Sequence, residues 1–383
     1  MSDPAASLPA AEDRGASPAR GRPESGRNES RREGPARDAP CYAALDLGTN
    51  NCRLLIATPA GQGFRVVEAF SRIVRLGDGL AHTGRLDENA VERAMAALHI
   101  CAERVKRRRA VRIKAVATQA CRSATNGADF VARVEAETGL KLKVISPREE
   151  AQLSVAGCAG LLDRADEAAL VVDVGGGSTE LSWLDLRGVD PSDPARPPPI
   201  LAWVSIPIGV VTLADRFPEA PGQGIEDRRQ WFEAMSAHVR EHISAFPHAE
   251  PLREVFERGG GHLIGTSGAI TSLAGLHLEL PRYERSRVDG LWMVREDCER
   301  AAERLMQLDA RGRAQEPCIG PDRADLVLAG AAILDAVQAL WPCPRVRVAD
   351  RGLREGILLS LMTERRKRRR RGRRGRPVAT AAE

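Results

Sequence analysis

The amino-acid sequence predicts an α/β protein built from two similar lobes that face each other across a cleft. From residue 41 to about residue 362, apolar strand patterns alternate with amphipathic helical patterns, the order typical of α/β domains. One pattern also occurs twice, at Asp46 and at Asp173: an apolar strand, Asp-x-Gly, small hydroxyl or amide residues and a returning strand. A duplication on this scale indicates two related lobes, with the two loops on opposite walls of one cleft.

Composition limits the class of protein. The 383 residues are ample for two domains, and because aromatic residues make up only 4%, the core must consist mainly of Val, Leu, Ile and Ala. No apolar stretch reaches about 18 residues, and the N-terminus lacks the apolar segment of a secretory signal. The eight cysteines form no CxxC pair, which argues against a zinc site and a disulfide scaffold. We therefore expect a cytoplasmic protein with reduced thiols and no membrane contact.

Both ends of the chain are predicted to be disordered. Residues 1–40 are rich in Pro, Gly, Ser, Arg and Glu, and residues 363–383 are strongly basic. The segment 365–376 carries ten Lys or Arg residues, so the rest of the chain has a net charge of −5 although the total is +5. We expect this tail to make weak contacts with polyanions or nucleic acid.

The first cycle of strands and helices precedes the second Asp-x-Gly pattern. Its strands are expected at Tyr42–Leu47, Arg53–Ala57, Phe64–Val74, Val111–Ala117 and Leu140–Ile145. One helix is expected to run from an N-cap at Asp87 through Arg108, and another from Asn126 to near Gly139. A third begins with Pro147 at its first position.

The second cycle has the same character. Its strands are expected at Ala169–Val174, Glu180–Leu186, Leu201–Ile206 and His262–Ile264. Its helices are expected at Gln230–Ala245, Gly268–Leu278, Arg295–Leu308 and Asp322–Leu340. Two further segments, Arg345–Val348 and Leu353–Leu361, close the folded part.

The first repeated loop has the residue types of an anion site. After Asp46, a glycine allows a sharp turn, and backbone amides with short polar side chains can surround a phosphate. The residues expected to do so are Gly48, Thr49, Asn50 and Asn51. Asp46 can hold Mg²⁺ directly or through water. The alternative is an ordinary hairpin turn.

The second repeated loop is more specific. Three consecutive glycines after an apolar strand cost backbone entropy, and a loop that approaches phosphate oxygens needs their lack of side chains. The expected phosphate-binding residues are Gly175, Gly176, Gly177, Ser178 and Thr179, with Asp173 as the second metal ligand. The alternative is a flexible glycine turn.

A third glycine-containing segment follows a strand and opens a helix. Backbone amides at a helix N-terminus form an anion site, so we expect phosphate contacts here. The residues concerned are Gly265, Thr266, Ser267 and Gly268. The alternative is a glycine-capped helix start.

A carboxylate pair and several arginines complete the candidate site. Phosphoanhydride hydrolysis needs a carboxylate to orient or deprotonate water, and we prefer Glu150 over Glu149 as this base. The alternative is simple stabilisation of the first helical turn. Arginine binds phosphate in a bidentate manner, and Arg53, Arg72, Arg75 and Arg122 lie close to these elements in sequence. Arg122 is the preferred catalytic arginine, and Arg53 is assigned to phosphate binding; surface charge is the alternative for each.

These motifs together resemble the exopolyphosphatase and guanosine pentaphosphate phosphatase (Ppx/GppA) family. The matching stretches are Ala44–Asn50, Val74–Gly77, Glu149–Ala151, Val172–Leu181, Gly265–Gly268 and Gly352–Gly356. The resemblance implies two RNase H-like lobes of the actin-like ATPase superfamily, Mg²⁺ dependence, and release of the terminal phosphate from inorganic polyphosphate or pppGpp. It also implies that Asp46 and Asp173 bind Mg²⁺, that Glu150 is the base, and that a homodimer is to be expected.

The resemblance leaves three points open. Some family members carry a Glu near the position of Gln119, and that Glu has been proposed as the base. Gln119 cannot accept a proton, so in this chain the role would fall on Glu150. The resemblance divides the lobes as 41–124, completed by about 345–362, and 125–344, whereas the strand count favours a boundary at Leu162. A sugar or acid kinase of the same superfamily and a polyanion- or RNA-binding regulatory protein remain alternatives, and the sequence does not separate polyphosphate from pppGpp.

Overall fold

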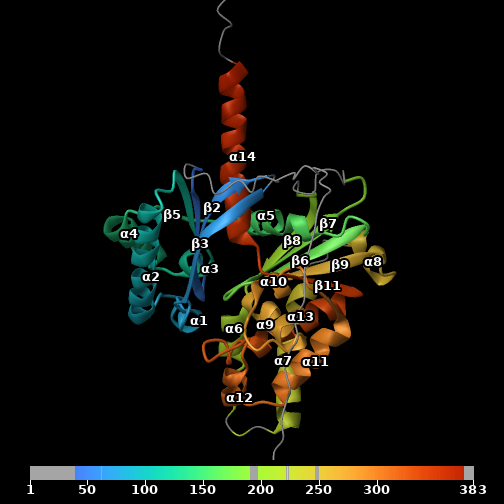
Figure 1. Ribbon diagram of the computed structural model, residues 1–383. Helices are drawn as coiled ribbons and strands as arrows, with labels where there is room; N and C mark the ends of the chain where they lie inside the picture. Colours follow the sequence, from blue (N-terminus) through green and yellow to red (C-terminus); the bar gives the residue numbers. More distant parts are fainter. Residues whose placement is uncertain are drawn as a thin grey trace, which may run out of the picture. The chain divides into compact units, whose positions relative to one another are not determined.

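The computed structural model describes residues 39–374, apart from residues 62, 190–196, 221, 223 and 246–249. Its strands form one five-stranded and one six-stranded mixed sheet, so the α/β fold class predicted from the sequence is confirmed (Figure 1). The predicted N-terminal tail lies almost wholly outside the described residues.

The first sheet has the strand order β3-β2-β1-β4-β5. Its strands are β1 (Tyr42–Leu47), β2 (Asn51–Ala60), β3 (Gly63–Ile73), β4 (Arg112–Ala117) and β5 (Leu142–Val144). The first three pair antiparallel as a meander, whereas β1, β4 and β5 run parallel. Each predicted strand of this half is present.

The second sheet repeats this arrangement and adds one strand. Its order is β10-β11-β9-β6-β7-β8, with β6 (Ala168–Val174), β7 (Thr179–Asp185), β8 (Ile200–Ile206), β9 (Gly261–Thr266), β10 (Trp292–Val294) and β11 (Arg345–Ala349). The strands β6, β7 and β8 form the antiparallel meander, and β6, β9 and β11 run parallel. The two sheets therefore share one topology, as the duplicated loop pattern predicted.

Helices follow the strands in both halves. In the first they are α1 (Leu80–Thr83), α2 (Glu88–Arg107), α3 (Gln119–Ser123), α4 (Gly127–Thr138) and α5 (Pro147–Cys158), followed by the 3₁₀ turn Ala159–Leu161. In the second they are α6 (Val210–Arg216), α7 (Ile225–Ser244), α8 (Glu250–Glu257), α9 (Gly268–His277), α10 (Arg285–Val288), α11 (Arg295–Met306), α12 (Ala310–Gln315) and α13 (Val327–Leu340). The final helix is α14 (Leu353–Arg374).

Two predicted helix starts depend on local capping. The Asp87 side chain accepts a hydrogen bond from the backbone N–H of Ala90 and caps α2. Pro147 stands in the first turn of α5, as predicted, and Ser146 is the N-cap. Asn126 precedes α4, but its side chain makes no cap bond and instead accepts from the backbone N–H of Leu86.

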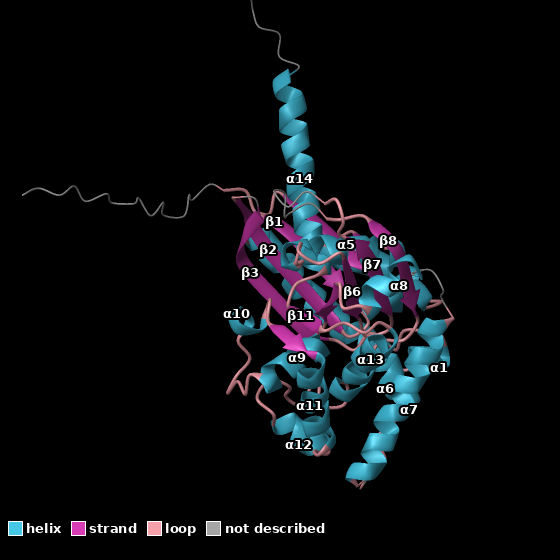
Figure 2. Cartoon of the chain, turned by 90° about the vertical axis from the view of Figure 1, so that its right-hand side faces the viewer, coloured by secondary structure: helices cyan, strands magenta, loops and turns pink. Residues whose placement is uncertain are grey.

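Both faces of each sheet are covered, which explains why the central strands read as almost continuous apolar runs. In the first sheet, Leu45 and Leu54 face α2 and α4, whereas Tyr42 and Leu55 face α5 and α14. In the second sheet, one face packs against α7, α9 and α13, and the other against α5. Figure 2 shows the helices α9, α11 and α13 grouped below the strands. Helix α5 thus contacts both sheets.

The boundary between the residues of the two sheets does not lie at residue 125, where the resemblance placed the lobe boundary. Helix α4 packs in the core of the first sheet through Phe130 and Val134, and β5 is a strand of that sheet. The strand β11, expected to complete the first lobe, pairs with β9 in the second sheet, while α14 packs on the first. These pairings agree better with the alternative boundary at Leu162, since the buried faces of α4 and β5 require the first sheet.

The chain passes between the sheets at two places. The first crossing is α5, and the second consists of residues 350–352, which join β11 to α14, together with the first turn of α14. The two crossings touch through backbone: a Cβ on Gly157 would lie 1.9 Å from the carbonyl oxygen of Gly352, and one on Gly356 would lie 1.9 Å from that of Leu153. Only glycine permits this approach.

The C-terminal segment differs from the prediction. The backbone is helical to Arg374, whereas disorder was expected from residue 363. Arg and Lys are good helix formers, so the packed first turns of α14 can continue into the basic segment. The predicted tail from residue 375 onward lies outside the described residues. Among the helices described, none is long and apolar enough to cross a membrane.

Candidate active site

The two repeated loops and the start of α9 line one cavity of about 190 Å³. It brings together most of the site residues predicted from the sequence. These are Asp46, Gly48, Thr49, Asn50, Asn51, Arg53, Glu150, Asp173, Gly175, Gly176, Gly177, Ser178, Thr266, Ser267 and Gly268. Residues from both sheets therefore converge on a single site, as the duplicated pattern suggested.

Three predicted site residues do not line this cavity. The Thr179 hydroxyl donates to the backbone oxygen of Ile208 at 2.7 Å and is fully buried. Gly265 faces the side chain of Ile270, which a Cβ would approach to 2.8 Å, so its role is packing against α9. Arg122 points toward protein acceptors instead of the cavity.

The first loop is held by the segment that follows β3. The backbone oxygen of Asn50 accepts from the N–H groups of Val74 and Arg75, at 2.9 and 3.0 Å, and the oxygen of Thr49 accepts from Gly77 at 2.9 Å. These bonds fix the turn after Asp46. They also explain why the stretch 74–77 accompanies the Asp-x-Gly loop in this sequence.

The second loop is held by α6. The oxygens of Gly175 and Gly176 accept from the first N–H groups of that helix, those of Val210 and Val211. The glycines also allow the two repeated loops to touch, because a Cβ on Gly176 would lie 3.0 Å from the backbone nitrogen of Asn50. Part of the reason for the glycine run is therefore contact between loops and not only space for phosphate.

The two aspartates stand in environments that disfavour charge. Burial raises the pKa of Asp46 above its usual value, and Arg53 and Arg354 oppose this rise. Burial raises the pKa of Asp173 to about 6, against a hydrogen bond from the Ser154 hydroxyl. Two buried carboxylates that line the same cavity, Asp46 and Asp173, indicate a site in which a bound cation would balance their charge.

The two glutamates of α5 have different surroundings. The Glu149 carboxylate forms ion pairs with Lys114 at 3.0 Å and Lys143 at 2.6 Å, which lower its pKa, and it does not line the cavity. Glu150 lines the cavity and is only 8% exposed. Burial, reinforced by the charge of Glu180, raises the pKa of Glu150 well above its usual range. A carboxylate with a raised pKa is the better general base near neutral pH.

Arg122 orients two residues at the edge of the cavity. Its guanidinium donates to the carboxylate of Glu150 at 3.3 Å, to the amide oxygen of Gln119 at 2.8 Å and to the backbone oxygen of Ile145 at 2.7 Å. Gln119 also donates to the Ser123 hydroxyl and lines the cavity. This geometry supports a positioning role for Arg122 toward Glu150.

Three cavity arginines have free guanidinium groups. Arg53, Arg323 and Arg354 line the cavity, and their side chains form no hydrogen bond or ion pair with any residue in the described ranges. Sequence reasoning selected Arg53 but missed the other two. Arg354 stands in the stretch 352–356 that matched the family, whereas Arg323 lies in a loop without any such signal. Unpaired arginines in a cavity are suited to binding a polyanion.

An ion pair and a hydrogen bond from Arg75 connect the segment after β3 to the segment that carries Arg323. The Arg75 guanidinium pairs with the Asp325 carboxylate at 2.9 Å and donates to the backbone oxygen of Asp322 at 3.3 Å. Its backbone adopts a positive φ of 46°. Arg75 therefore holds the loop and does not face the cavity, whereas Arg72 lies over the ring of Phe70.

The oxygen atoms around Asp46 fit a hard cation. Among the described residues, no group of three or more His, Cys, Asp or Glu side chains is arranged as a metal-ligand set. However, buried oxygens of Asp46, Thr49 and Asn50 have no hydrogen-bond partner. Mg²⁺ is usually bound by one or two carboxylates together with waters and substrate phosphates, so this small donor set is compatible with it.

Comparison with known proteins identifies the family of this chain. A model of the Ppx/GppA phosphatase family matches residues 55–365. A solved Aquifex aeolicus member of that family is 26% identical, with 85% of this chain and 98% of that chain covered and a TM-score of 0.67. An exopolyphosphatase-like protein is 28% identical over the same shares, with a TM-score of 0.71. An exopolyphosphatase from Cytophaga hutchinsonii, 24% identical with a TM-score of 0.72 and the same coverage, shares the fold. This chain belongs to the Ppx/GppA phosphatase family.

Proposed function

We propose that the protein hydrolyses the terminal phosphoanhydride bond of inorganic polyphosphate, of pppGpp, or of both, and releases phosphate. The observation that carries this proposal is that one cavity holds a buried carboxylate and three arginines that pair with no residue in the described part of the chain. Arg53, Arg323 and Arg354 supply positive charge for a chain of phosphates, and Glu150 supplies a proton acceptor. Family membership supports the class of reaction.

The residues of this chain divide the work between binding and proton transfer. The arginines and the backbone amides of the two repeated loops bind phosphate oxygens and orient the terminal group. Glu150 orients the attacking water and accepts its proton, and its raised pKa suits that role. Arg122, bonded to Glu150, keeps the carboxylate directed to the cavity.

We infer that Mg²⁺ is the cofactor. Asp46 and Asp173 would hold it, with Thr49 and Asn50 as further oxygen donors. When bound, Mg²⁺ neutralises charge on phosphate oxygens and polarises the phosphoryl group. The cation would also offset the repulsion between Asp46 and Asp173, which adds to the effect of burial on the pKa of Asp173.

The test is phosphate release measured side by side on long polyphosphate, tripolyphosphate and pppGpp, with and without Mg²⁺. The proposal expects Mg²⁺-dependent release from at least one substrate and its loss on chelation. ATP with a sugar or acid acceptor serves as a further arm. Formation of ADP there without phosphate release from the other substrates would instead identify a phosphotransferase and reject the proposal.

A further inference from the structure

The free arginines of the cavity lie beside acidic residues with which they do not pair. Asp350 and Glu355 both line the cavity, on either side of Arg354 in the sequence. Burial lowers the pKa of Arg354, and Glu355 is the carboxylate that opposes this most. Opposite charges so close would attract, and a carboxylate paired with Arg354 would compete with phosphate. Something must therefore hold these carboxylates away.

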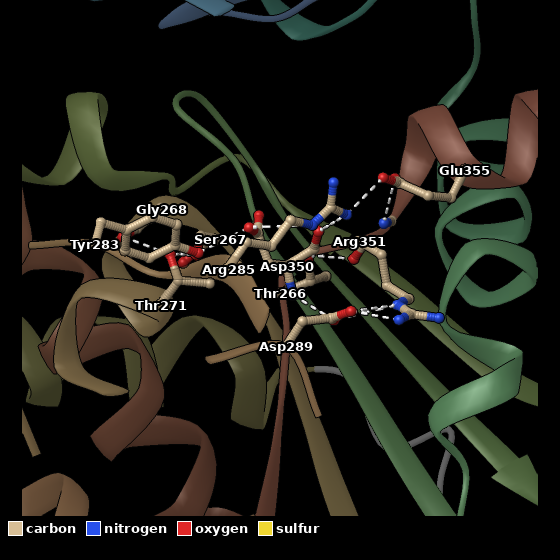
Figure 3. Close-up of polar contacts among 11 residues, drawn as sticks. Thr266, Ser267, Gly268, Thr271, Tyr283, Arg285, Asp289, Asp350, Arg351 and Glu355 are labelled. Carbon is tan, nitrogen blue, oxygen red and sulfur yellow. Dashed lines mark hydrogen bonds and ion pairs between the residues drawn. The ribbon is translucent and has the colours of Figure 1, made fainter. Parts of the chain in front are cut away.

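Both oxygens of Glu355 are engaged elsewhere. Its Oε1 accepts from Nη2 of Arg285 at 3.1 Å, and its Oε2 accepts from the backbone N–H of Gly352 at 2.9 Å (Figure 3). The Glu355 residue is only 4% exposed. Its carboxylate is thus directed to the start of α14 and to Arg285, and not to Arg354.

Asp350 is restrained by the same arginine. Its Oδ2 accepts from the hydroxyl of Tyr283 at 2.8 Å and lies 3.4 Å from Nε of Arg285. Arg285 also donates to the backbone oxygen of Asp350, as Figure 3 shows. Arg285 comes from the short helix α10 and does not line the cavity. One residue outside the cavity therefore holds both neighbouring carboxylates.

The neighbouring Arg351 shows what pairing does to a cavity arginine. It lines the cavity, but its Nε lies 3.0 Å from the Asp289 carboxylate. Donors of the Arg351 guanidinium are already paired with Asp289, so fewer of them are available to bind an anionic substrate. Arg354 lacks such a partner among the described residues.

We propose that Arg285 is a positioning residue that keeps Arg354 free for an anionic substrate by holding Glu355 and Asp350 away from it. The inference rests on the proposed function, because a free Arg354 matters only for a phosphate-bearing ligand. Arg285 itself touches no substrate. Without it, Glu355 can turn to Arg354, and substrate binding weakens while the groups that carry out the reaction are unaltered.

The experiment compares four full-length variants for tripolyphosphate hydrolysis and for equilibrium binding of tripolyphosphate without Mg²⁺. Arg285→Leu should raise KM and the dissociation constant about ten-fold, the size of one charged hydrogen bond, with kcat within about two-fold of the native value. The KM and the dissociation constant of Arg285→Lys should lie between those of the native protein and those of Arg285→Leu. Arg287→Leu, on the same helix and exposed, removes equal charge and is the matched control.

The double variant Arg285→Leu/Glu355→Gln gives the deciding result. The glutamine can still accept from the N–H of Gly352, but it carries no charge to attract Arg354. We therefore expect it to restore most of the affinity lost in Arg285→Leu. A double variant as weak as the single one, or an equal loss in Arg287→Leu, would overturn the inference. If the native protein bound tripolyphosphate but released no phosphate from any substrate, the proposed function alone would fail.

Discussion

Replacement of Glu150 by glutamine is the most direct test of the proposed chemistry. Glutamine has the same shape and can still accept a hydrogen bond from Arg122, but it cannot accept a proton. Glu150 lines the cavity and Glu149, the other carboxylate of α5, does not, so no second carboxylate of this helix can replace it. Turnover should fall sharply, whereas binding of polyphosphate should persist.

The size of the loss follows from the role. Removing a positioned general base typically costs about 10²–10⁴-fold in rate, or about 2.7–5.4 kcal/mol of transition-state stabilisation. The structural cost is small by comparison. The contact of Glu150 with Arg122 is long, at 3.3 Å, and the substitution also removes a buried charge whose pKa is raised by burial. The two effects on stability oppose each other, so the melting temperature should stay within about 3 °C.

Glu149→Gln is the internal control. That carboxylate pairs with Lys114 and Lys143 outside the cavity, and its side chain is 27% exposed. Such pairs contribute about 1 kcal/mol or less to stability, so the variant should stay folded. Because Glu149 does not line the cavity, turnover should change by less than about two-fold. The assay is steady-state phosphate release on tripolyphosphate with saturating Mg²⁺, with thermal unfolding of each variant. A Glu150→Gln enzyme that keeps more than about a third of native turnover would show that another group is the base.

Three further predictions follow from other parts of the molecule. The pKa of Glu150 is raised first by burial and then by the charge of Glu180, and Glu180→Gln removes that charge. Because the base works deprotonated, the acid limb of the kcat/KM profile should move to lower pH, and an unmoved limb would contradict the assignment of the base. Truncation after Glu364 removes ten Lys or Arg residues. The KM for long polyphosphate should therefore rise several-fold at low salt and stay unchanged at high salt, whereas the KM for tripolyphosphate should not change. An equal rise in KM for both substrates would argue against capture of polyanions by the tail. Gly157→Ala places a Cβ 1.9 Å from the carbonyl oxygen of Gly352, so urea unfolding should show that the free energy of unfolding falls by about 2–3 kcal/mol. In the control Gly160→Ala, the nearest atom lies 4.0 Å from the new Cβ, and the free energy of unfolding should fall by less than about 0.5 kcal/mol. Similar losses in both variants would refute the packing argument.

The central strands and the main helices could be predicted because their signals are local. The runs Tyr42–Leu47 and Ala169–Val174 are apolar except for one aspartate near the end of each, as expected for strands covered on both faces. The N-cap at Asp87 and the proline at the start of α5 mark helix starts in the sequence itself. The short elements α10 and β10 span four and three residues, too few for any periodicity to show.

The charge state of the site could not be predicted, because it depends on partners distant in sequence. Arg122 and Arg354 are both arginines with no local sign of their partners in the sequence. The Arg122 guanidinium is engaged by Glu150 and Gln119, whereas that of Arg354 pairs with none of the residues that the structure describes. Only the folded chain shows that Arg285 engages the carboxylate next to Arg354. The lobe boundary had the same difficulty, since β11, expected in the first lobe, pairs with β9 of the second sheet, a strand much earlier in the chain.

The duplication also explains how one turn came to serve two purposes. In the first sheet Asp46 stands opposite Arg53 across the hairpin, and in the second Asp173 stands opposite Glu180. The two pairs occupy equivalent positions, because β1 and β2 correspond to β6 and β7 in the shared topology. The aspartate is common to both, whereas its partner is a cation that lines the cavity in one half and a buried acid in the other. The hairpin of the first sheet thus supplies one of the arginines that line the cavity, and the hairpin of the second supplies an acid whose charge adds to the effect of burial in raising the pKa of Glu150.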